Sequence, residues 1–149
     1  MPDETGKSRT QAEFGGKFLV IYFYPKDDTP GCTREACAYR DAVEELRKLN
    51  ATVVGVSKDG ASSHQKFKEK HGLNFPLLVD ANGEFAKQMG AWGVKKFMGK
   101  SFEGVRRNTY LVSPTGEVVK KWEDVNPAGH ITDVVKEITR RIGIRDEEQ

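Results

Sequence analysis

Cys32 and Cys37 are the only cysteines in this 149-residue chain, and both lie within the segment YPKDDTPGCTREAC. A close pair of thiols can act as a nucleophile, a redox couple or part of a metal site. The spacing of five positions differs from the C-x-x-C motif of thiol-disulfide oxidoreductases. A zinc site needs four ligands, and the sequence offers no histidine near the pair. Redox or nucleophilic chemistry therefore fits these thiols best.

Cys32 follows a Pro-Gly pair, and the pattern predicts that a helix begins at it or just after it. The unpaired N–H groups and the dipole of a helix N-terminus favour an anion, and a thiolate is such an anion. Thr29 can supply a hydroxyl group to the same place. The Pro-Gly pair before Cys32 and the charged residues after it predict that this thiol is exposed.

Cys37 is expected one and a half turns into the same helix, beside Ala36 on its buried side. In an intact helix, five residues give a rise of ~7.5 Å and a rotation of ~140°. The two Cα atoms are then ~8.6 Å apart, beyond the ~7 Å at which a disulfide can form. A bond between Cys32 and Cys37 therefore requires the first turns to unwind, which suits a catalytic cycle better than a fixed crosslink.

The elements that must position these residues alternate between strand and helix. The apolar run FLVIYFY predicts a strand buried on both faces. The order is β-α-β-α-β-α-β-β-α, which indicates a three-layer α/β domain. Cys32 lies where the first strand meets the first helix, and chemistry collects at such junctions. The predicted strands cover 18–24, 52–57, 77–79, 108–113 and 118–122, and the helices cover 33–49, 62–71, 83–89 and 131–142.

Composition narrows the function classes. The 24 basic and 22 acidic residues give a net charge of +2, which offers no case for nucleic acid or a membrane surface as the main partner. No apolar run approaches the ~18 residues that span a bilayer, and the polar start shows no secretory signal. Two cysteines fit a reducing cytosol. We expect a single domain over 1–149 with a loose tail at 143–149.

Pro25, Thr29 and Cys32 fit the P-x-x-x-T-x-x-C signature of peroxiredoxins. The string FYPKDDTPGCTREAC, with its second cysteine, resembles the subfamily of the bacterioferritin comigratory protein, also called PrxQ. The segments NFPLLVD, WGVKKFMGKSFEG and RNTYLV, which contains Arg107, match the same subfamily. The resemblance extends over residues 14–142.

This resemblance implies a thioredoxin-like fold, with a central mixed sheet flanked by helices, and a thiol-dependent peroxidase that needs no cofactor or metal. The substrates would be hydrogen peroxide and organic hydroperoxides. Cys32 would be the peroxidatic cysteine and Cys37 the resolving one. Thioredoxin or a similar dithiol would reduce the disulfide between them. The subfamily also favours a monomer.

Three further residues match the active site of the family. Arg107 would face the thiolate, Thr29 would hydrogen-bond the peroxide and the thiolate, and Pro25 would shield the pocket. Preorganised donors of this kind stabilise the negative charge that develops over sulfur and two oxygens. Arginine suits this role because its planar guanidinium group presents several hydrogen-bond donors in fixed directions. Strand alternation sends the neighbouring Arg106 to the surface.

The chain departs from the family at its start, where members usually have a longer segment with a G-D-x-A-P-x-F stretch. Either the chain is truncated or it is a short form, and an N-terminal strand or hairpin would be missing. We interpret Asp27 and Asp28 as solvated loop residues. The three histidines are dispersed in polar contexts, and we expect them to be solvated: His64, His71 and His130.

Two other functions remain open from the residues alone. A thiol-disulfide oxidoreductase on the same fold would prefer a C-x-x-C motif. A redox sensor or holdase would use helix unwinding to expose an apolar surface, although nothing in the sequence marks a dedicated partner surface.

Overall fold

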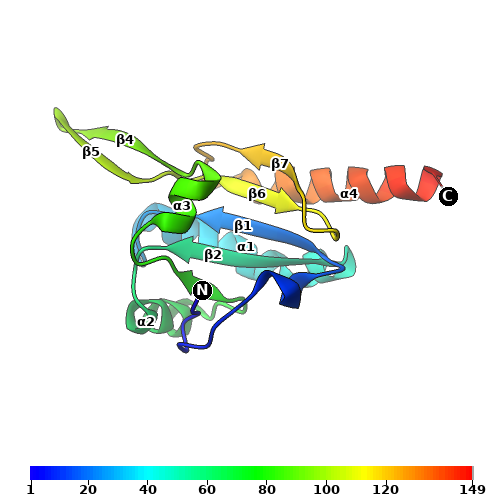
Figure 1. The fold of residues 1–149 in the computed structure, drawn as a ribbon, viewed down its shortest axis with the longest axis horizontal. Helices are drawn as coiled ribbons and strands as arrows, with labels where there is room; N and C mark the ends of the chain where they lie inside the picture. Colours follow the sequence, from blue (N-terminus) through cyan, green and yellow to red (C-terminus); the bar gives the residue numbers. More distant parts are fainter. Residues whose placement is uncertain (149) are drawn as a thin grey trace.

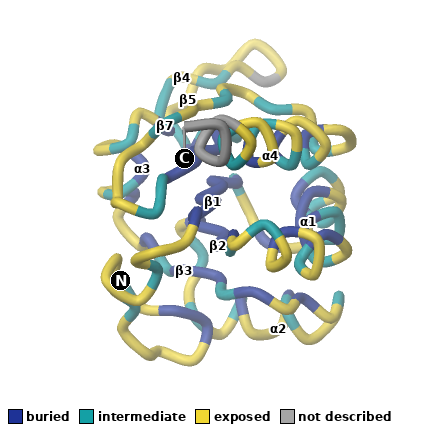
Figure 2. The backbone as a smooth tube through the Cα atoms, turned by 90° about the vertical axis from the view of Figure 1, so that its right-hand side faces the viewer, coloured by how far each residue is buried: buried dark blue, intermediate teal, exposed yellow. Residues whose placement is uncertain are grey.

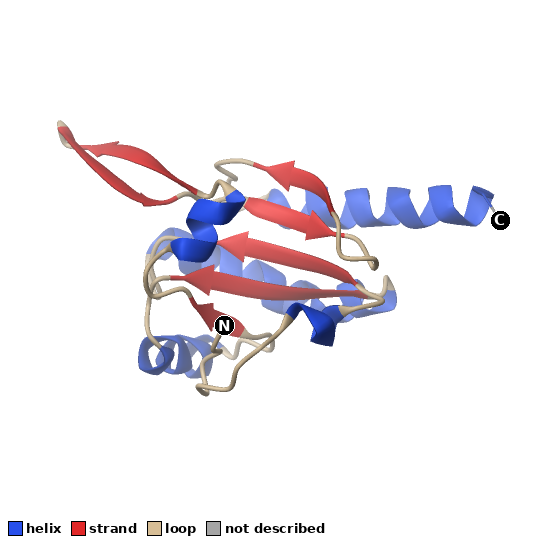
Figure 3. Ribbon diagram, viewed as in Figure 1, coloured by secondary structure: helices blue, strands red, loops and turns tan. Residues whose placement is uncertain are grey.

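A mixed sheet of five strands, in the order β3-β2-β1-β6-β7, forms the centre of the molecule (Figures 1 and 3). The computed structural model describes residues 1–148, apart from the side chains of Phe97 and residues 144–148. β1, β2 and β3 run parallel, whereas β6 is antiparallel to β1 and β7 is antiparallel to β6. The strands are β1 (Phe18–Phe23), β2 (Ala51–Ser57), β3 (Leu77–Val79), β6 (Thr109–Val112) and β7 (Val118–Trp122).

Helices cover both faces of the sheet (Figure 1). One core cluster joins the sheet to α1 (Pro30–Lys48), α2 (Ala61–His71) and α4 (His130–Glu148). The other joins the opposite face to α3 (Glu84–Met89) and the 3-10 helix η1 (Gln11–Phe14). Figure 2 shows that burial is concentrated in the strands and on the inner sides of the helices. None of the helices in the described chain is long and apolar enough to cross a bilayer.

The burial of β1 on both faces explains why its sequence is apolar at every position and does not alternate with polar residues. All six of its residues are buried. Val20 and Tyr22 point into the cluster under α1, while Leu19, Ile21 and Phe23 point into the cluster under α3. A strand covered on both faces needs apolar side chains at every position. α1 buries one side in the same cluster, because Ala36, Tyr39 and Leu46 are buried and Val43 packs against them.

Three features differ from the sequence-based predictions. A hairpin of β4 (Trp92–Phe97) and β5 (Lys100–Val105) projects from the body and was not predicted (Figure 1). Its turn at Met98 and Gly99 has φ of 51° and 78°, as two-residue hairpin turns require. α1 begins at Pro30 rather than at residue 33, since proline suits a first helical turn. α4 includes residues 143–148, which were expected to be a loose tail.

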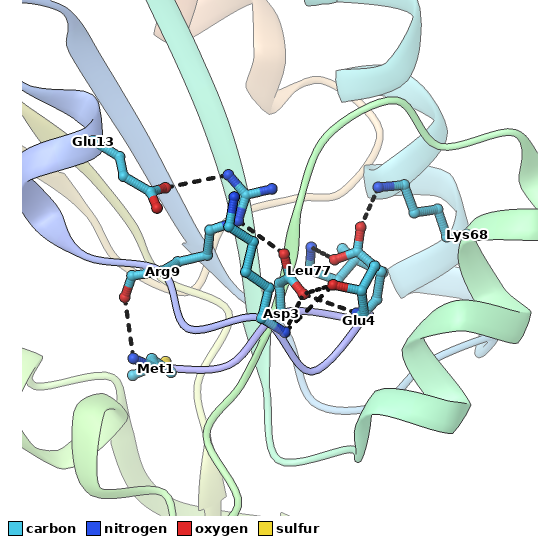
Figure 4. Close-up of polar contacts among 9 residues, drawn as sticks. Met1, Asp3, Glu4, Arg9, Glu13, Lys68 and Leu77 are labelled. Carbon is cyan, nitrogen blue, oxygen red and sulfur yellow. Dashed lines mark hydrogen bonds and ion pairs between the residues drawn. The ribbon is translucent and has the colours of Figure 1, made fainter.

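The first residues of the chain are fastened to the edge of the sheet at β3. The N–H of Val79 donates to the carbonyl of Pro2 over 2.8 Å. Figure 4 shows the two buried acids of this segment: Asp3 bonds to Arg9, and Glu4 pairs with Lys68 of α2. A covered edge strand is protected from pairing with other chains.

Candidate active site

Cys32 is the third residue of α1, directly after the loop that leaves β1. Its side chain is buried, with 1% of its surface exposed, so the expectation of an exposed thiol is wrong. Cys32 belongs to the core cluster under α1, and Arg107 also covers it, with Nη2 donating to Cys32 Sγ over 3.3 Å. The thiol therefore lies at the N-terminus of a helix and under a guanidinium group at the same time.

Arg107 reaches Cys32 from the segment that leads into β6, 75 positions away in the sequence. Its carbonyl accepts a hydrogen bond from the N–H of Val125 over 2.8 Å, which holds the backbone in place. Gly31 leaves room for the side chain, because a Cβ there would lie 3.1 Å from Arg107 Nη2. Arg106 turns the other way, with 39% of its side chain exposed, and pairs with Asp124 over 3.5 Å. Arg107 thus contacts Cys32, whereas Arg106 contacts Asp124.

Glu35 completes the cluster and was missed by the sequence analysis. Its Oε1 accepts from Arg107 Nη1 over 3.0 Å, so one guanidinium group bridges the carboxyl and the sulfur of Cys32. Burial raises the pKa of Glu35 to about 7, against the opposing charge and hydrogen bond of Arg107. Its spacing of three residues from Cys32 was the available signal, since such positions share a helix face.

Two aromatic side chains lie in the same buried cluster as Cys32. Tyr22 and Tyr39 are stacked with centroids 4.6 Å apart, and both are fully buried. Burial, with a smaller contribution from the charge of Glu35, raises the pKa of each well above its usual value, so both phenols are neutral. Surroundings that exclude water strengthen the attraction between Arg107 and a thiolate.

The other predicted residues lie in the loop before α1 or in α1 itself. Thr29 is the N-cap of α1, and its hydroxyl donates to the carbonyl of Lys26 over 2.9 Å instead of capping the helix. Pro25 is half-buried in the same loop. Cys37 is half-buried farther along α1, and both cysteines are free thiols. The structure thus joins Cys32 to Arg107 and leaves Cys37 as a separate thiol on the same helix.

Three residues that we interpreted as solvated are buried. Asp27, His64 and His130 have 8%, 0% and 5% of their surface exposed. His64 contacts Asp27, while His130 packs edge-on against Trp122. Sequence context could not reveal this, because His64 and Asp27 are 37 positions apart.

Comparison with known proteins identifies the family of the chain. Residues 1–121 match the AhpC/TSA family. Peroxiredoxin Bcp of Bacillus subtilis is 42% identical over 131 residues, which is 88% of this chain and 83% of that protein. Peroxiredoxin Bcp of Escherichia coli K12 is 38% identical over 130 residues, 87% of this chain and 83% of that one.

A solved structure of the bacterioferritin comigratory protein of Xanthomonas campestris superimposes with a TM-score of 0.89 at 36% identity. The superposition covers 94% of this chain and 89% of the other, so the fold is the predicted thioredoxin-like α/β fold with its mixed sheet and flanking helices. The chain therefore belongs to the AhpC/TSA family, within the bacterioferritin comigratory protein or PrxQ subfamily of peroxiredoxins, and is a thiol peroxidase.

Proposed function

We propose that this peroxidase reduces hydrogen peroxide and organic hydroperoxides through Cys32 and Cys37, and that thioredoxin or a similar dithiol restores it. The observation that carries the proposal is the 3.3 Å contact between Arg107 Nη2 and Cys32 Sγ at the first turn of α1. The alkyl peroxide reduction activity of the similar Xanthomonas campestris protein supports organic hydroperoxides as substrates.

In the first step, the Cys32 thiolate attacks the terminal oxygen of the peroxide. A sulfur–oxygen bond forms, the O–O bond breaks, and the departing oxygen takes up a proton to leave as water or an alcohol. Cys32 becomes a sulfenic acid. Arg107 is positioned to stabilise the negative charge spread over sulfur and oxygen. Thr29, at the N-cap beside Cys32, would hydrogen-bond the bound peroxide, and Pro25 would limit the access of water.

In the second step, the Cys37 thiol condenses with the sulfenic acid, which forms a disulfide and releases one water molecule. Because both residues lie in α1, the first turns of this helix must unwind for the sulfurs to meet. A dithiol reductant then exchanges with the disulfide and returns both cysteines to thiols while it becomes oxidised itself.

The test is a thiol count by mass spectrometry after one equivalent of hydrogen peroxide, on wild type, Cys32→Ser and Cys37→Ser. We expect an intramolecular disulfide in wild type, a sulfenic acid in Cys37→Ser and no reaction in Cys32→Ser. Equal, slow oxidation of all three proteins would overturn the assignment of the two cysteines. Insulin reduction without peroxide consumption would favour a thiol-disulfide oxidoreductase instead.

A further inference from the structure

A second buried polar cluster lies beside the active site, between α2 and the loop that joins β1 to α1. Its centre is the carboxylate of Asp27. Oδ1 accepts from Tyr24 Oη over 2.6 Å, and Oδ2 accepts from Ser63 Oγ over 2.8 Å. Oδ2 also lies 2.7 Å from Nδ1 of His64. The reaction proposed above uses none of these side chains.

The contacts of His64 determine where its protons must be. Its Nε2 lies 2.8 Å from the carbonyl oxygen of Leu78, which can only accept, so Nε2 carries a proton. Its Nδ1 faces a carboxylate oxygen, which also accepts unless it is protonated itself. The 2.7 Å contact with Asp27 therefore requires one more proton, and an imidazolium–carboxylate pair satisfies it.

The charges around His64 are consistent with this pair. Burial alone would lower the pKa of His64, but the hydrogen bond and the charge of Asp27 raise it above its usual value. Asp59, after β2, adds a weaker contribution in the same direction and accepts from the N–H of Asp27 over 2.8 Å. Tyr24, directly after β1, contributes its hydroxyl, and β3 contributes only a carbonyl oxygen.

The loop held by this pair is the one that carries Thr29 and starts α1. Asp27 lies midway between Pro25 and Thr29, and Asp28 has a left-handed backbone with φ of 58°. Asp28 also reaches α2, where it contacts His71 over 2.9 Å, but this second pair is exposed. Two adjacent acids thus fasten one loop to one helix, the first in the interior and the second at the surface.

We propose that Asp27 and His64 are positioning residues of the peroxidase: their buried ion pair holds the loop so that Thr29 and the first turn of α1 receive the peroxide. The inference rests on the proposed function. Loss of the proton on Nδ1 at alkaline pH would set a lone pair against the Asp27 carboxylate, loosen the loop and slow the reaction with peroxide.

The measured quantity is the rate constant for hydrogen peroxide divided by the rate constant for alkylation of Cys32 by iodoacetamide. The alkylation rate depends on the amount of Cys32 thiolate and does not require a peroxide to bind. The ratio therefore reports how well the site is positioned for peroxide. Displacement of catalytic groups by about 1 Å can cost a hundredfold. We expect His64→Leu to lower the ratio about tenfold or more. His71→Leu, which breaks the exposed pair on the same loop, should stay within about twofold of wild type.

Asp27→Asn is the conservative rescue. Its amide can donate to Nδ1 of a neutral His64 while its oxygen still accepts from Tyr24, so the loop stays fastened without the shared proton. We expect a ratio near that of wild type and no alkaline decline. In wild type the ratio should fall over the pH range in which ¹⁵N NMR shows the ring nitrogens of His64 to titrate. This measurement tests the inference even if His64→Leu does not fold.

A wild-type ratio that stays flat while His64 titrates would overturn the inference, as would equal ratios in His64→Leu and His71→Leu. In both cases an active wild type would leave the proposed function intact. A wild type that consumes no peroxide would instead refute the proposed function, and the positioning role with it.

Discussion

Two regions of this molecule bury a carboxyl group against an arginine, with opposite results. In the N-terminal cluster, Asp3 bonds to Arg9 over 2.8 Å and also accepts from the N–H and the hydroxyl of Thr5 over 2.8 and 2.6 Å. In the active site, Glu35 accepts from Arg107 over 3.0 Å, and among the described residues its Oε2 has no hydrogen-bond partner.

The number of donors accounts for the difference. Burial acts to raise the pKa of both carboxyls, but the hydrogen bonds from Thr5 and Arg9 hold the pKa of Asp3 well below its usual value. For Glu35 burial prevails, and the pKa rises to about 7. The two arginines also differ in their second contact. The second contact of Arg9 is the partly exposed Glu13, whereas that of Arg107 is the sulfur of Cys32. A carboxyl group that accepts several hydrogen bonds, as Asp3 does, stabilises the fold. Glu35 takes one hydrogen bond from Arg107, and another nitrogen of that arginine contacts the sulfur of Cys32.

The largest expected effect separates the two arginines. Arg107→Ala should lower the rate constant for hydrogen peroxide about 100- to 1,000-fold, as the loss of one preorganised donor does elsewhere. Arg9→Ala should leave that rate unchanged and lower the free energy of unfolding by about 1–3 kcal/mol, because Asp3 loses a charged partner. Stopped-flow kinetics and urea titrations on both variants would measure this. Equal losses of activity would contradict the comparison.

The two carboxyl groups should also give opposite dependences of stability on pH. The pKa of Glu35 is higher in the folded state than in the unfolded chain, so its contribution is present below about pH 4.5 and lost as pH rises through about 7. The loss is at most roughly 3 kcal/mol. Glu35→Gln should remove it. Urea unfolding of the reduced protein at pH 5 and pH 8 would show this as a decline that is steeper in wild type than in the variant, and parallel declines would contradict it.

The active site was partly predictable, for reasons that differ between residues. Cys32 and Thr29 belong to one short motif at a strand–helix junction, so local sequence places them together. Arg107 lies far away in the chain, and only resemblance to a family linked it to Cys32. Glu35 could have been found from helix periodicity alone, since it follows Cys32 by three positions.

The missed features have two causes. Polar residues were interpreted as solvated, but Asp27 and His64 are buried because each satisfies the other across 37 positions. No local pattern encodes such a pair. The β4–β5 hairpin was missed because its exposed strands lack the buried face that produces alternation: both faces carry exposed residues, such as Val94 and Phe102.

A smaller effect is expected at Asp3. Asp3→Asn keeps an oxygen that can accept from Thr5 but removes the charge that Arg9 faces, so the free energy of unfolding should fall by about 2 kcal/mol at neutral pH. The pKa of Asp3 is depressed in the folded state, so this contribution is present above about pH 4 and lost as pH falls further. Wild type and variant should therefore converge in acid. A variant that consumed peroxide more slowly would show that this cluster is not purely structural.

The smallest effect concerns Lys68, which joins the N-terminal cluster to α2 through Glu4. The lysine side chain is 30% exposed but Glu4 is only 6% exposed, so Lys68→Met should cost about 1 kcal/mol in urea unfolding. The same helix, α2, also contacts the active-site loop, through His64 and Asp27. If the two regions act separately, Lys68→Met speeds hydrogen exchange in residues 1–9 and leaves the ratio of peroxide to alkylation rates unchanged. A change in that ratio would mean that the N-terminal segment sets the position of α2, and through it the loop that carries Thr29.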